Sequence, residues 1–592
     1  MSTLPAAAEP ADHVRADGVS ADDRRRAAAV LVAVAGPARR RGVPVEDLLL
    51  WRLAGGAAPG RHAAGRVGAD LPDDDPAGLV GAALERATDA GRRRAHGLHV
   101  TPSWLAGDLV GLALPAPGAA PAGRAAVCDP ACGGGAFLVA AARLLHERGV
   151  DRRRIVRDLV WGADIDPVGV AAAEAALALW AGEVPPPGRL VVADALREGP
   201  AAWPGRPAGG FAAVVGNPPF QNQLGRATAR SDDDRRRLRA RYGEAVRAYT
   251  DTAWLFLLLG LDLVAPGGRV AMVEPQSVIA ARDAEAVRRA VASRSDLADL
   301  WLDDGRVFSA AVRVCAPVVQ RHAVAPTLAA DPVGGGEWSR AWARALDLPA
   351  VAVEPPGEGG TLGDRAVVVA GFRDQYYGLA GTVRELADLP PGAPVAPLVT
   401  SGAVDWAACT WGERPVRYAK AAWRAPVVDP GRLAAAPAIA RRWVERTAAP
   451  KLVVATQTRV VEAGVDVEGR WVPSVPALAV VPVEPDDLWA LAAAVLAPAT
   501  SAWLAHRSAG TALDRGALRV AGPDLAALPL PVDGEAWGEA ADALRDHAAA
   551  PGPEALDRYL AAATRAYRST PAVTAWWRGR AGTAVRPPAR DG

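Results

Sequence analysis

Four consecutive residues near the middle of the chain, Asn217-Pro218-Pro219-Phe220, follow the apolar run 211–215. Pro218 and Pro219 lack N–H groups and have a fixed φ, so this segment can neither pair as a central strand nor easily begin a helix. We therefore expect a rigid loop that presents the Asn217 carboxamide, the Pro218 carbonyl and the face of Phe220. Two hydrogen-bond acceptors beside an aromatic ring suit a planar amine carried by a heterocycle.

A glycine-rich turn, 129–135, follows an earlier apolar run and precedes an apolar helical pattern. Glycines between a strand and a helix let the backbone approach a ligand closely. The dinucleotide fingerprint would need glycine at Leu138, and the phosphate-binding P-loop would need a lysine that this turn lacks. Asp129 would repel a phosphate but would accept from an ammonium. The turn thus favours an amino acid–nucleoside conjugate as its ligand.

Two later apolar runs also end in acidic residues. Asp164 can accept hydrogen bonds from both hydroxyls of a ribose, and Asp166 is the second candidate, although it can instead cap the helix that begins at Pro167. Asp194 can accept from the exocyclic amine of an adenine. Each residue alone is more often a helix cap than a ligand. Three carboxylates at successive strand ends, ahead of the Asn-Pro-Pro-Phe loop, favour a binding site.

The elements that would position these residues follow a repeated β–α pattern. We predict helices over 136–146 and 168–180. Repeated β–α units imply an α/β fold with a doubly wound, mainly parallel sheet, whose ligands bind beyond the C-terminal ends of the strands. The predicted strands cover 125–128, 159–163, 190–193, 212–215, 269–273, 297–302 and 312–320.

With 592 residues the chain is too long for one hydrophobic core. We expect an N-terminal helical region over 1–95, an α/β domain over 96–325, a further domain of mixed α/β type over 326–570, and a tail over 571–592. The apolar stretch 27–35 is too short to span a bilayer and is interpreted as a buried helix. No membrane partner is expected.

Composition sets further limits. The net charge is +1, so any nucleic-acid surface must be local. The four cysteines, Cys128, Cys132, Cys315 and Cys409, make no zinc or disulfide framework, which fits a reduced cytoplasmic setting, and no metal is required. Arginine outnumbers lysine so strongly that raw arginine counts carry little functional weight.

Taken together, the motifs D-P-A-C-G-G-G-x-F-L, G-A-D-I-D-P, A-D-A and N-P-P-F resemble those of the S-adenosylmethionine-dependent adenine-N6 DNA methyltransferases. Thr101-Pro102, ahead of the glycine turn, looks like the T-P motif of that family, which helps bind the cofactor. The order of motifs resembles the gamma arrangement of type I modification subunits and many type II restriction-modification enzymes. The resemblance covers about 95–325. Gly134 departs from it, since the family often has serine there.

The resemblance implies a Rossmann-like methyltransferase domain that acts on an adenine flipped out of double-stranded DNA. Asn217 and Pro218 would accept from the N6 amine and Phe220 would stack on the base, with Pro219 completing the catalytic loop. The region after about 330 would recognise the target sequence, and a separate restriction or specificity subunit is a further partner. The cofactor-binding residues that it implies are Thr101, Pro102, Asp129, Pro130, Ala131, Gly133, Gly135, Asp164 and Asp194.

Several alternatives stay open on the sequence alone. The arginine-rich segment 224–250 could contact phosphates beside a flipped base, or form a solvated helix capped by Ser231. The same loop chemistry would serve methylation of adenine in RNA or of a protein glutamine amide, and a non-catalytic DNA-binding subunit is a third possibility. Neither Lys420 nor Lys451 has the acid two residues earlier that a common nuclease core needs, so we predict no nuclease in this chain.

Overall fold

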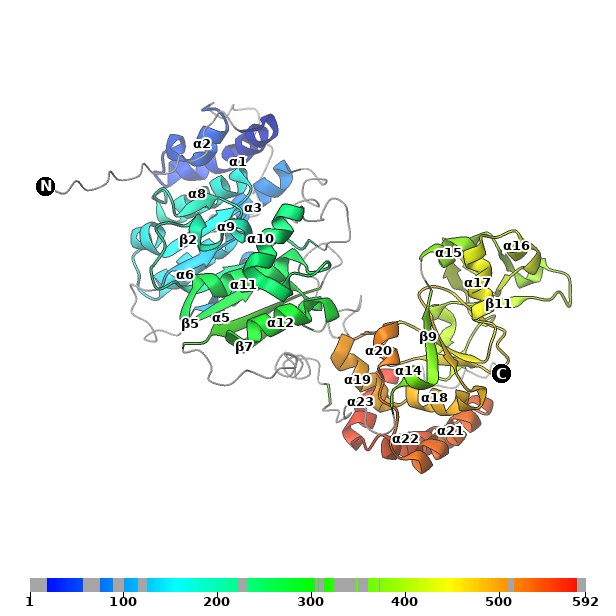
Figure 1. The fold of residues 1–592 in the computed structure, drawn as a ribbon. Helices are drawn as coiled ribbons and strands as arrows, with labels where there is room; N and C mark the ends of the chain where they lie inside the picture. Colours follow the sequence, from blue (N-terminus) through cyan, green and yellow to red (C-terminus); the bar gives the residue numbers. More distant parts are fainter. Residues whose placement is uncertain are drawn as a thin grey trace. The chain divides into compact units, whose positions relative to one another are not determined.

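The computed structural model describes residues 19–56, 75–88, 101–114, 125–221, 231–279, 281–303, 307, 313–323, 348–349, 360–371, 373–508 and 516–582. The chain divides into two compact units, Met1–Ala341 and Trp342–Gly592, which are described separately. Figure 1 shows the elements of both. The stretch 115–123, whose proline, glycine and alanine content predicts a linker, lies outside the described residues.

An eight-stranded sheet is the centre of the first unit, in the order β3-β2-β1-β4-β5-β8-β6 with β7 paired to β8. Strands β1 to β5 run parallel to their neighbours, and β8 is antiparallel to β5, β6 and β7. All seven strands predicted from the sequence are present, and the two-residue β6 is additional. The strands are β1 (Val127–Asp129), β2 (Val160–Asp164), β3 (Leu190–Val192), β4 (Phe211–Gly216), β5 (Val264–Met272), β6 (Glu274–Pro275), β7 (Ser295–Leu302) and β8 (Val314–Arg321).

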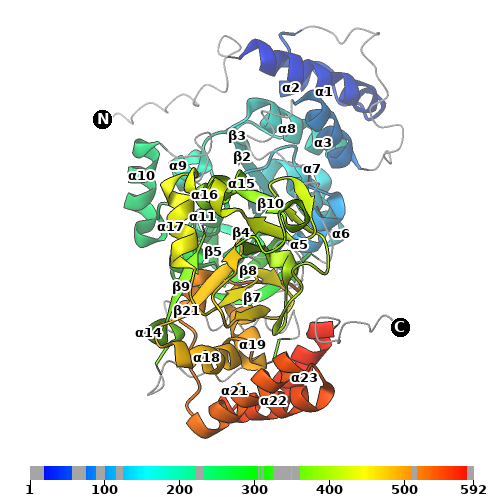
Figure 2. The same ribbon diagram turned by 90° about the vertical axis from the view of Figure 1, so that its right-hand side faces the viewer.

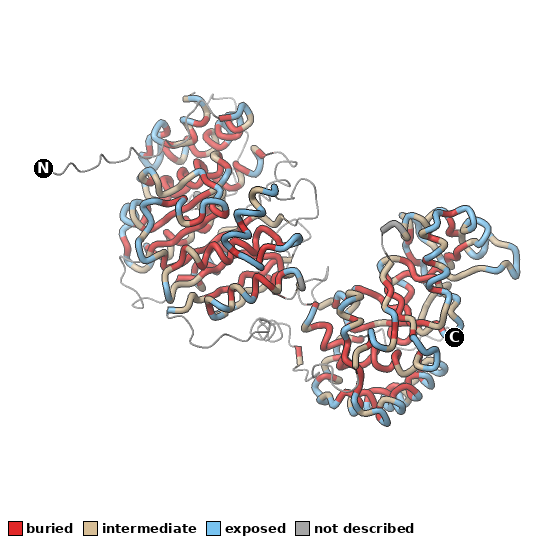
Figure 3. The backbone as a smooth tube through the Cα atoms, in the orientation of Figure 1, coloured by how far each residue is buried: buried red, intermediate tan, exposed pale blue. Residues whose placement is uncertain are grey.

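Helices cover the sheet on both faces (Figures 1 and 2). The helices α5 (Ser103–Ala113), α6 (Ala136–Glu147) and α8 (Pro167–Ala181) pack beside one another, and α11 (Thr252–Leu263) packs with α12 (Glu285–Ala292). The central strands are buried along their whole length, as expected for a parallel sheet between two helical layers. Figure 3 shows this buried interior. The predicted doubly wound α/β fold is confirmed.

The N-terminal helices belong to the same core as the sheet. Helix α1 (Ala21–Arg40) contains the apolar stretch predicted to be buried, and its residues Val30, Leu31 and Val34 are at most 1 % exposed. Helices α1, α2 (Leu49–Leu53) and α3 (Pro76–Ala87) all pack against α8. One continuous apolar cluster therefore joins these helices to the sheet. The expected N-terminal region is helical, but it is not a separate body within the described residues.

The second unit is of mixed α/β type. One antiparallel sheet has the order β19-β17-β21-β9, formed by Ala463–Asp466, Lys451–Val454, Leu478–Pro482 and Ala366–Ala370. A second sheet has the order β10-β16-β11-β20, formed by Val383–Glu385, Pro426–Val428, Ala396–Val399 and Val472–Pro473. Helices α15 (Arg373–Ala380) and α17 (Ala438–Arg446) pack together, and a helical group comprises α18 (Leu488–Val495), α19 (Pro498–Ser508), α21 (Gly534–Ala549), α22 (Pro553–Ala566) and α23 (Pro571–Ala581).

Helix α23 corrects the expected tail at 571–592. Residues 571–581 are helical, and Trp577 is fully buried, with its ring centroid 5.3 Å from that of Trp406. The burial of this large aromatic side chain keeps the segment on the helical group. Among the described residues no single helix is long and apolar enough to cross a membrane, and only the bent pair Pro485–Val495 and Pro498–Ser508 reaches that length and composition jointly.

Candidate active site

Four of the predicted site residues lie side by side along one edge of the sheet. Asp194, Asp164, Asp129 and Asn217 end or follow β3, β2, β1 and β4, and these four strands are consecutive neighbours in the sheet. Because the strands are parallel, their C-terminal ends meet at one edge, with adjacent strands about 4.8 Å apart. The edge therefore presents three carboxyl groups and one carboxamide in a row, as the sequence predicted.

The Asn217 carboxamide is partly buried and oriented by a neighbour distant in sequence. Its Nδ2 donates a hydrogen bond of 3.1 Å to Oγ1 of Thr101. The T-P motif and the Asn-Pro-Pro-Phe loop thus meet in space, although 116 positions separate them. With Nδ2 occupied by Thr101, Oδ1 is the carboxamide atom left to accept from an amine.

Contacts on both sides hold the Asn-Pro-Pro-Phe loop in place. At its start, the Val273 amide donates to the Gly216 carbonyl at 2.9 Å. At its end, the Gln221 amide donates at 3.0 Å to Oδ1 of Asp251, the residue that caps α11. Pro218 is buried and Phe220 is partly buried against the core. The rigidity predicted from two prolines is therefore reinforced at each end.

Asp129 links the catalytic loop to the glycine turn. It is 1 % exposed, and its Oδ1 accepts from the Ala131 amide at 3.0 Å. A Cβ placed on Gly216 would lie 2.7 Å from this same oxygen, so only glycine fits between Asp129 and Asn217. Burial, together with the nearby Asp164 charge, raises the pKa of Asp129 to about 8.

Asp164 connects the glycine turn to the start of α8 through its two carboxyl oxygens. Oδ2 accepts from the Gly133 amide at 2.8 Å, and Oδ1 accepts from the Asp166 amide at 2.9 Å. Burial raises the pKa of Asp164 to about 6, in spite of these hydrogen bonds. Asp166 instead caps α8 by accepting from the Val168 amide at 3.1 Å. Of the two readings that the sequence left open for Asp166, the structure has the helix cap.

Two glycines of the turn have left-handed backbones, with φ of 47° at Gly133 and 86° at Gly135. A Cβ on Gly135 would lie 2.9 Å from Cα of Ala173 on α8. Gly134 is different, since a Cβ there would be no closer than 3.7 Å to any neighbour. The serine that the family often carries at this position would fit, so the departure leaves the backbone of the turn unaffected.

Asp194 caps α9 (Ala195–Glu198), accepting from the Arg197 amide at 3.1 Å, and its side chain is exposed. Beside it are two apolar side chains that the sequence analysis did not single out. Ile165 is 55 % exposed and Val192 is 38 % exposed, and Val192 pairs with Asp164 across β2 and β3. Exposed apolar groups between these carboxylates suit the face of a heterocycle. The sequence signal for this apolar surface was Ile165, an isoleucine between two aspartates after a strand.

The described part of the arginine-rich segment contains the helix α10 (Asp232–Tyr242). Ser231 caps this helix, as the hypothesis of a solvated helix predicted. Arg235, Arg236 and Arg237 form exposed ion pairs with aspartates of the helix's own first turn. Arg239 and Arg241 donate to backbone carbonyls instead. Arg226 and Arg230 lie outside the described residues. Within the described part, these contacts favour the solvated helix over a preformed phosphate site.

The donor set fits S-adenosylmethionine. Asp129 is a buried and Asp164 a partly buried carboxyl group, and both have raised pKa values, so each gains from a positively charged or hydrogen-bond-donating partner. A methionine ammonium and ribose hydroxyls supply both kinds of group. The left-handed glycines Gly133 and Gly135 have no side chains, so the backbone of the turn there stays open to a ligand. No group of three or more His, Cys, Asp or Glu side chains in the described ranges could hold a metal ion.

The sheet order and the row of acceptors define the class of Rossmann-like methyltransferases. Residues 87–312 match the family model described as N-6 DNA Methylase. Over these residues the chain is similar to the N-6 DNA methylases, at the place where the sequence motifs resemble that family. None of the curated proteins is similar enough in sequence to match.

Similar solved structures extend beyond this domain. The Type IIL restriction-modification enzyme MmeI, solved in complex with DNA, is 13 % identical with a TM-score of 0.55, covering 86 % of this chain and 81 % of that one. A DrdV–DNA complex is 13 % identical with a TM-score of 0.47, covering 87 % and 65 %. A modification subunit of a type I restriction enzyme from Vibrio vulnificus YJ016 is 22 % identical with a TM-score of 0.33, covering 41 % and 48 %. The likeness to MmeI is one of fold.

Proposed function

We propose that this protein transfers a methyl group from S-adenosylmethionine to N6 of an adenine flipped out of double-stranded DNA, as part of a restriction-modification or phage-defence system. The proposal rests above all on one contact. The Thr101 hydroxyl accepts from Asn217 Nδ2 at 3.1 Å and leaves Oδ1 to accept from the amine. The N-6 DNA Methylase match over 87–312 gives the reaction its class.

The catalytic loop acts mainly by orientation. Oδ1 of Asn217 and the carbonyl of Pro218 accept the two N6 hydrogens, and Phe220 stacks on the base. When bound, S-adenosylmethionine supplies an electrophilic methyl group on its sulfonium. The two acceptors turn the N6 lone pair toward that group and favour a tetrahedral nitrogen. Fixing two reactants in line accounts for much of the rate gain, and neither a covalent intermediate nor a metal is needed.

The cofactor residues have distinct roles in this proposal. Asp129 accepts from the ammonium and Asp164 from the ribose hydroxyls, while Asp194 accepts from the adenine amine. The turn that includes Pro130, Ala131, Gly133 and Gly135 contributes backbone. Thr101-Pro102 closes the site beside Asn217. Ile165 and Val192 pack on the faces of the heterocycle; both are exposed at the sheet edge.

DNA is the favoured substrate because the family match is to DNA methylases and because the fold similarity to MmeI reaches well past the catalytic domain. We assign target recognition to the second unit, Trp342–Gly592, which contains most of the domain predicted over 326–570. A restriction or specificity subunit is a further partner, and the protein acts in the cytoplasm. Exposed Arg235, Arg236 and Arg237 would exchange their aspartate partners for phosphates only at a cost in ion pairs, so their part in DNA binding is minor.

The test is tritiated methyl transfer from S-adenosylmethionine to DNA, RNA and protein substrates, followed by nucleoside analysis for N6-methyladenine. Asn217→Ala should abolish transfer and retain cofactor binding, while Asp164→Ala should lose cofactor binding. Asp158→Ala is the matched control and should change neither, because this half-exposed acid lies just before the same strand and pairs with Arg157 and Arg189.

Label in RNA or in a protein glutamine, with no N6-methyladenine in any DNA, would overturn the assignment of substrate while keeping the reaction class. Cofactor binding without transfer to any polymer would instead favour a non-catalytic DNA-binding subunit.

A further inference from the structure

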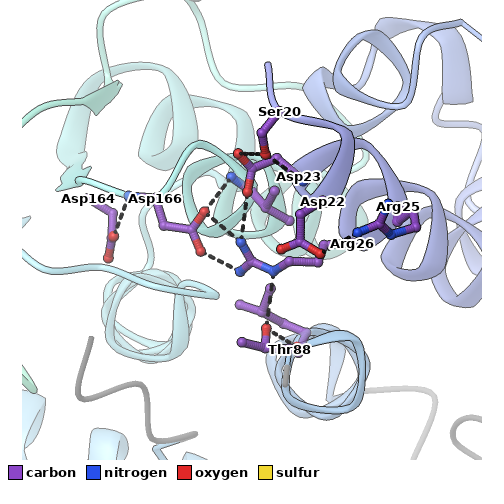
Figure 4. Close-up of polar contacts among 10 residues, drawn as sticks. Ser20, Asp22, Asp23, Arg25, Arg26, Thr88, Asp164 and Asp166 are labelled. Carbon is purple, nitrogen blue, oxygen red and sulfur yellow. Dashed lines mark hydrogen bonds and ion pairs between the residues drawn. The ribbon is translucent and has the colours of Figure 1, made fainter. Parts of the chain in front are cut away.

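A buried arginine of the N-terminal helix α1 contacts an aspartate of its own helix and two segments distant in sequence (Figure 4). Arg26 is 2 % exposed. Its Nε donates to Oγ1 of Thr88 at 3.2 Å, and its Nη1 donates to Oδ1 of Asp23 at 3.1 Å. The two terminal nitrogens also form a forked pair with Asp166, at 3.1 Å from Nη1 to Oδ1 and 2.5 Å from Nη2 to Oδ2. Such two-point pairs fix orientation as well as distance.

Asp166 connects Arg26 to the glycine turn through Asp164. Its carboxylate caps α8 and pairs with Arg26, while its own amide donates to Oδ1 of Asp164 at 2.9 Å. The other oxygen of Asp164 accepts from the Gly133 amide at 2.8 Å. A continuous series of contacts thus runs from Arg26 through Asp166 and Asp164 to Gly133, and Figure 4 shows its first part.

Arg26 also anchors the C-terminal end of α3. The side chain of Thr88, the residue that ends this helix, is held twice, since Oγ1 donates to the Leu84 carbonyl at 2.8 Å and accepts from Arg26. Arg26 therefore joins α1 and α3 to the start of α8.

We propose that Arg26 is a positioning residue of the cofactor site, which makes helix α1 a working part of the methyltransferase domain. The inference rests on the proposed binding of S-adenosylmethionine. A buried ion pair is a poor means of stabilising a fold, because well-packed apolar side chains of similar volume often do as well or better. The forked pair between Arg26 and Asp166 instead fixes the position of Asp166, whose amide orients Asp164. This positioning accounts for the presence of the pair.

The test compares Arg26→Met with Arg25→Met in the full-length chain. Arg25 is the neighbour of Arg26 on the same helix, but it is exposed and pairs only with Asp22 in the contacts of Figure 4, at 3.0 Å. We expect Arg26→Met to raise the Kd for S-adenosylmethionine at least about 10-fold, because Asp164 and the glycine turn must then be ordered when the cofactor binds. Transfer at saturating cofactor should fall far less, and Arg25→Met should match the wild type.

A second readout needs no ligand. Hydrogen–deuterium exchange of the free protein should quicken at the Gly133 and Asp166 amides, both of which donate to Asp164, in Arg26→Met and not in Arg25→Met. If the wild type fails to bind S-adenosylmethionine, the proposed function fails, but this exchange result still decides whether Arg26 orders the turn.

Arg26→Met leaves Asp166 and Asp23 without their shared partner, so the variant could unfold. Arg26→Met/Asp166→Asn removes both members of the forked pair, and Arg26→Lys keeps the charge without the fork. If Arg26 acts through Asp166, adding Arg26→Met to Asp166→Asn should change the Kd by less than about twofold. Unchanged Kd and unchanged exchange in folded Arg26→Met, or in folded Arg26→Lys if Met unfolds, would overturn the proposal.

Discussion

Asn217 gains its function from a residue that the motif itself does not contain. A carboxamide can present either its oxygen or its nitrogen to a ligand, and the adenine amine requires the oxygen. The hydroxyl of Thr101 settles this choice by accepting from Nδ2. In the proposed mechanism the T-P motif therefore bears on catalysis as well as on cofactor binding, which its position before the glycine turn did not indicate.

Thr101→Val tests this link. The variant keeps the shape of the side chain but loses the acceptor for Nδ2, so Asn217 can rotate out of register with the amine. A hydrogen bond of this kind contributes about 1 kcal/mol, which corresponds to a fall of roughly 5- to 10-fold in the single-turnover rate at saturating cofactor. Thr101→Ser retains the hydroxyl and should keep most of the rate. Equal rates for Thr101→Val and the wild type would contradict the orienting role.

The raised pKa of Asp129, about 8, makes cofactor binding dependent on pH. In the free protein the neutral acid predominates below that pH, whereas a bound ammonium favours the carboxylate. Binding near pH 7 should therefore release a proton, and affinity should increase from pH 6 toward pH 8, where the ligand's own amine, with a pKa of about 8, begins to lose its charge. Calorimetry in buffers of different ionisation enthalpy counts the protons released.

Asp129→Asn should bind more weakly and lose the share of the proton release that belongs to Asp129, in the upper part of this range. Asp164, with a pKa near 6, contributes to the lower part of the same curve and should do so in both proteins. A wild-type affinity that stays constant between pH 6 and pH 8 would rule out Asp129 as the partner of the ammonium.

Glu274 is a buried acid of the catalytic domain that the proposed mechanism does not use. It is fully buried, neither carboxyl oxygen has a hydrogen-bond partner among the described residues, and burial raises its pKa well above the usual 4.5. Because the folded protein binds this proton more tightly than the unfolded chain, stability should fall as pH rises above about 4.5, by up to about 1.4 kcal/mol per unit while the acid stays protonated.

Glu274→Gln cannot ionise and removes that dependence. Thermal unfolding should show the variant gaining Tm relative to the wild type as pH is raised from 5 to 8, with little gain at pH 5. A Tm difference that does not change with pH would mean that Glu274 is already ionised in the folded protein.

At the scale of elements, the glycine turn shows which glycines the fold requires. Gly135→Ala places a Cβ 2.9 Å from Cα of Ala173 on a left-handed backbone with φ of 86°. The left-handed conformation alone costs about 1–2 kcal/mol, and the contact with backbone atoms adds to it. Urea unfolding should show this loss together with weaker cofactor binding. Gly134→Ser, whose Cβ has room, is the control and should stay within about 0.5 kcal/mol of the wild type.

The same elements show how far the sequence could be interpreted. The seven strands and the mainly parallel sheet were predictable because short apolar runs alternated with helical patterns, whereas the antiparallel pairing of β8 with β5 and β7 was not. The role of Asp166 was not, since its partner Arg26 lies 140 residues away and one sequence does not indicate which arginine comes back to it. The ion pairs within α10 could have been predicted from the sequence, because its aspartates and arginines stand three and four residues apart on a helix.

On the scale of the whole molecule, the catalytic domain includes helices that lie before its first sequence motif. The motifs begin at Thr101, yet helices α1 to α3 share one apolar cluster with the sheet. A truncation at about residue 95 would expose the faces of α6 and α8 and unpair Asp166. The family match at 87–312 thus marks the conserved chemistry rather than the full folding unit.

The second unit bears on whether this chain also cuts DNA, as a restriction-modification enzyme with its own nuclease would. The common nuclease core places a lysine two residues after an acid. The chain has two lysines, with Tyr418 before Lys420 and Ala449 before Lys451. Lys451 is fully buried, and its Nζ lies 2.5 Å from Oδ2 of Asp466, so it cannot reach a phosphate.

Lys420 occupies the turn between β14 (Val416–Tyr418) and β15 (Ala421–Trp423), with a left-handed φ of 67° and an exposed side chain. We therefore expect the purified chain to methylate unmodified DNA without cleaving it when Mg²⁺ is added, as judged by gel analysis of a plasmid carrying many adenine contexts. Cleavage that disappears in Lys420→Ala would refute this reading of Lys420, and cleavage that persists in that variant would require a nuclease centre without lysine.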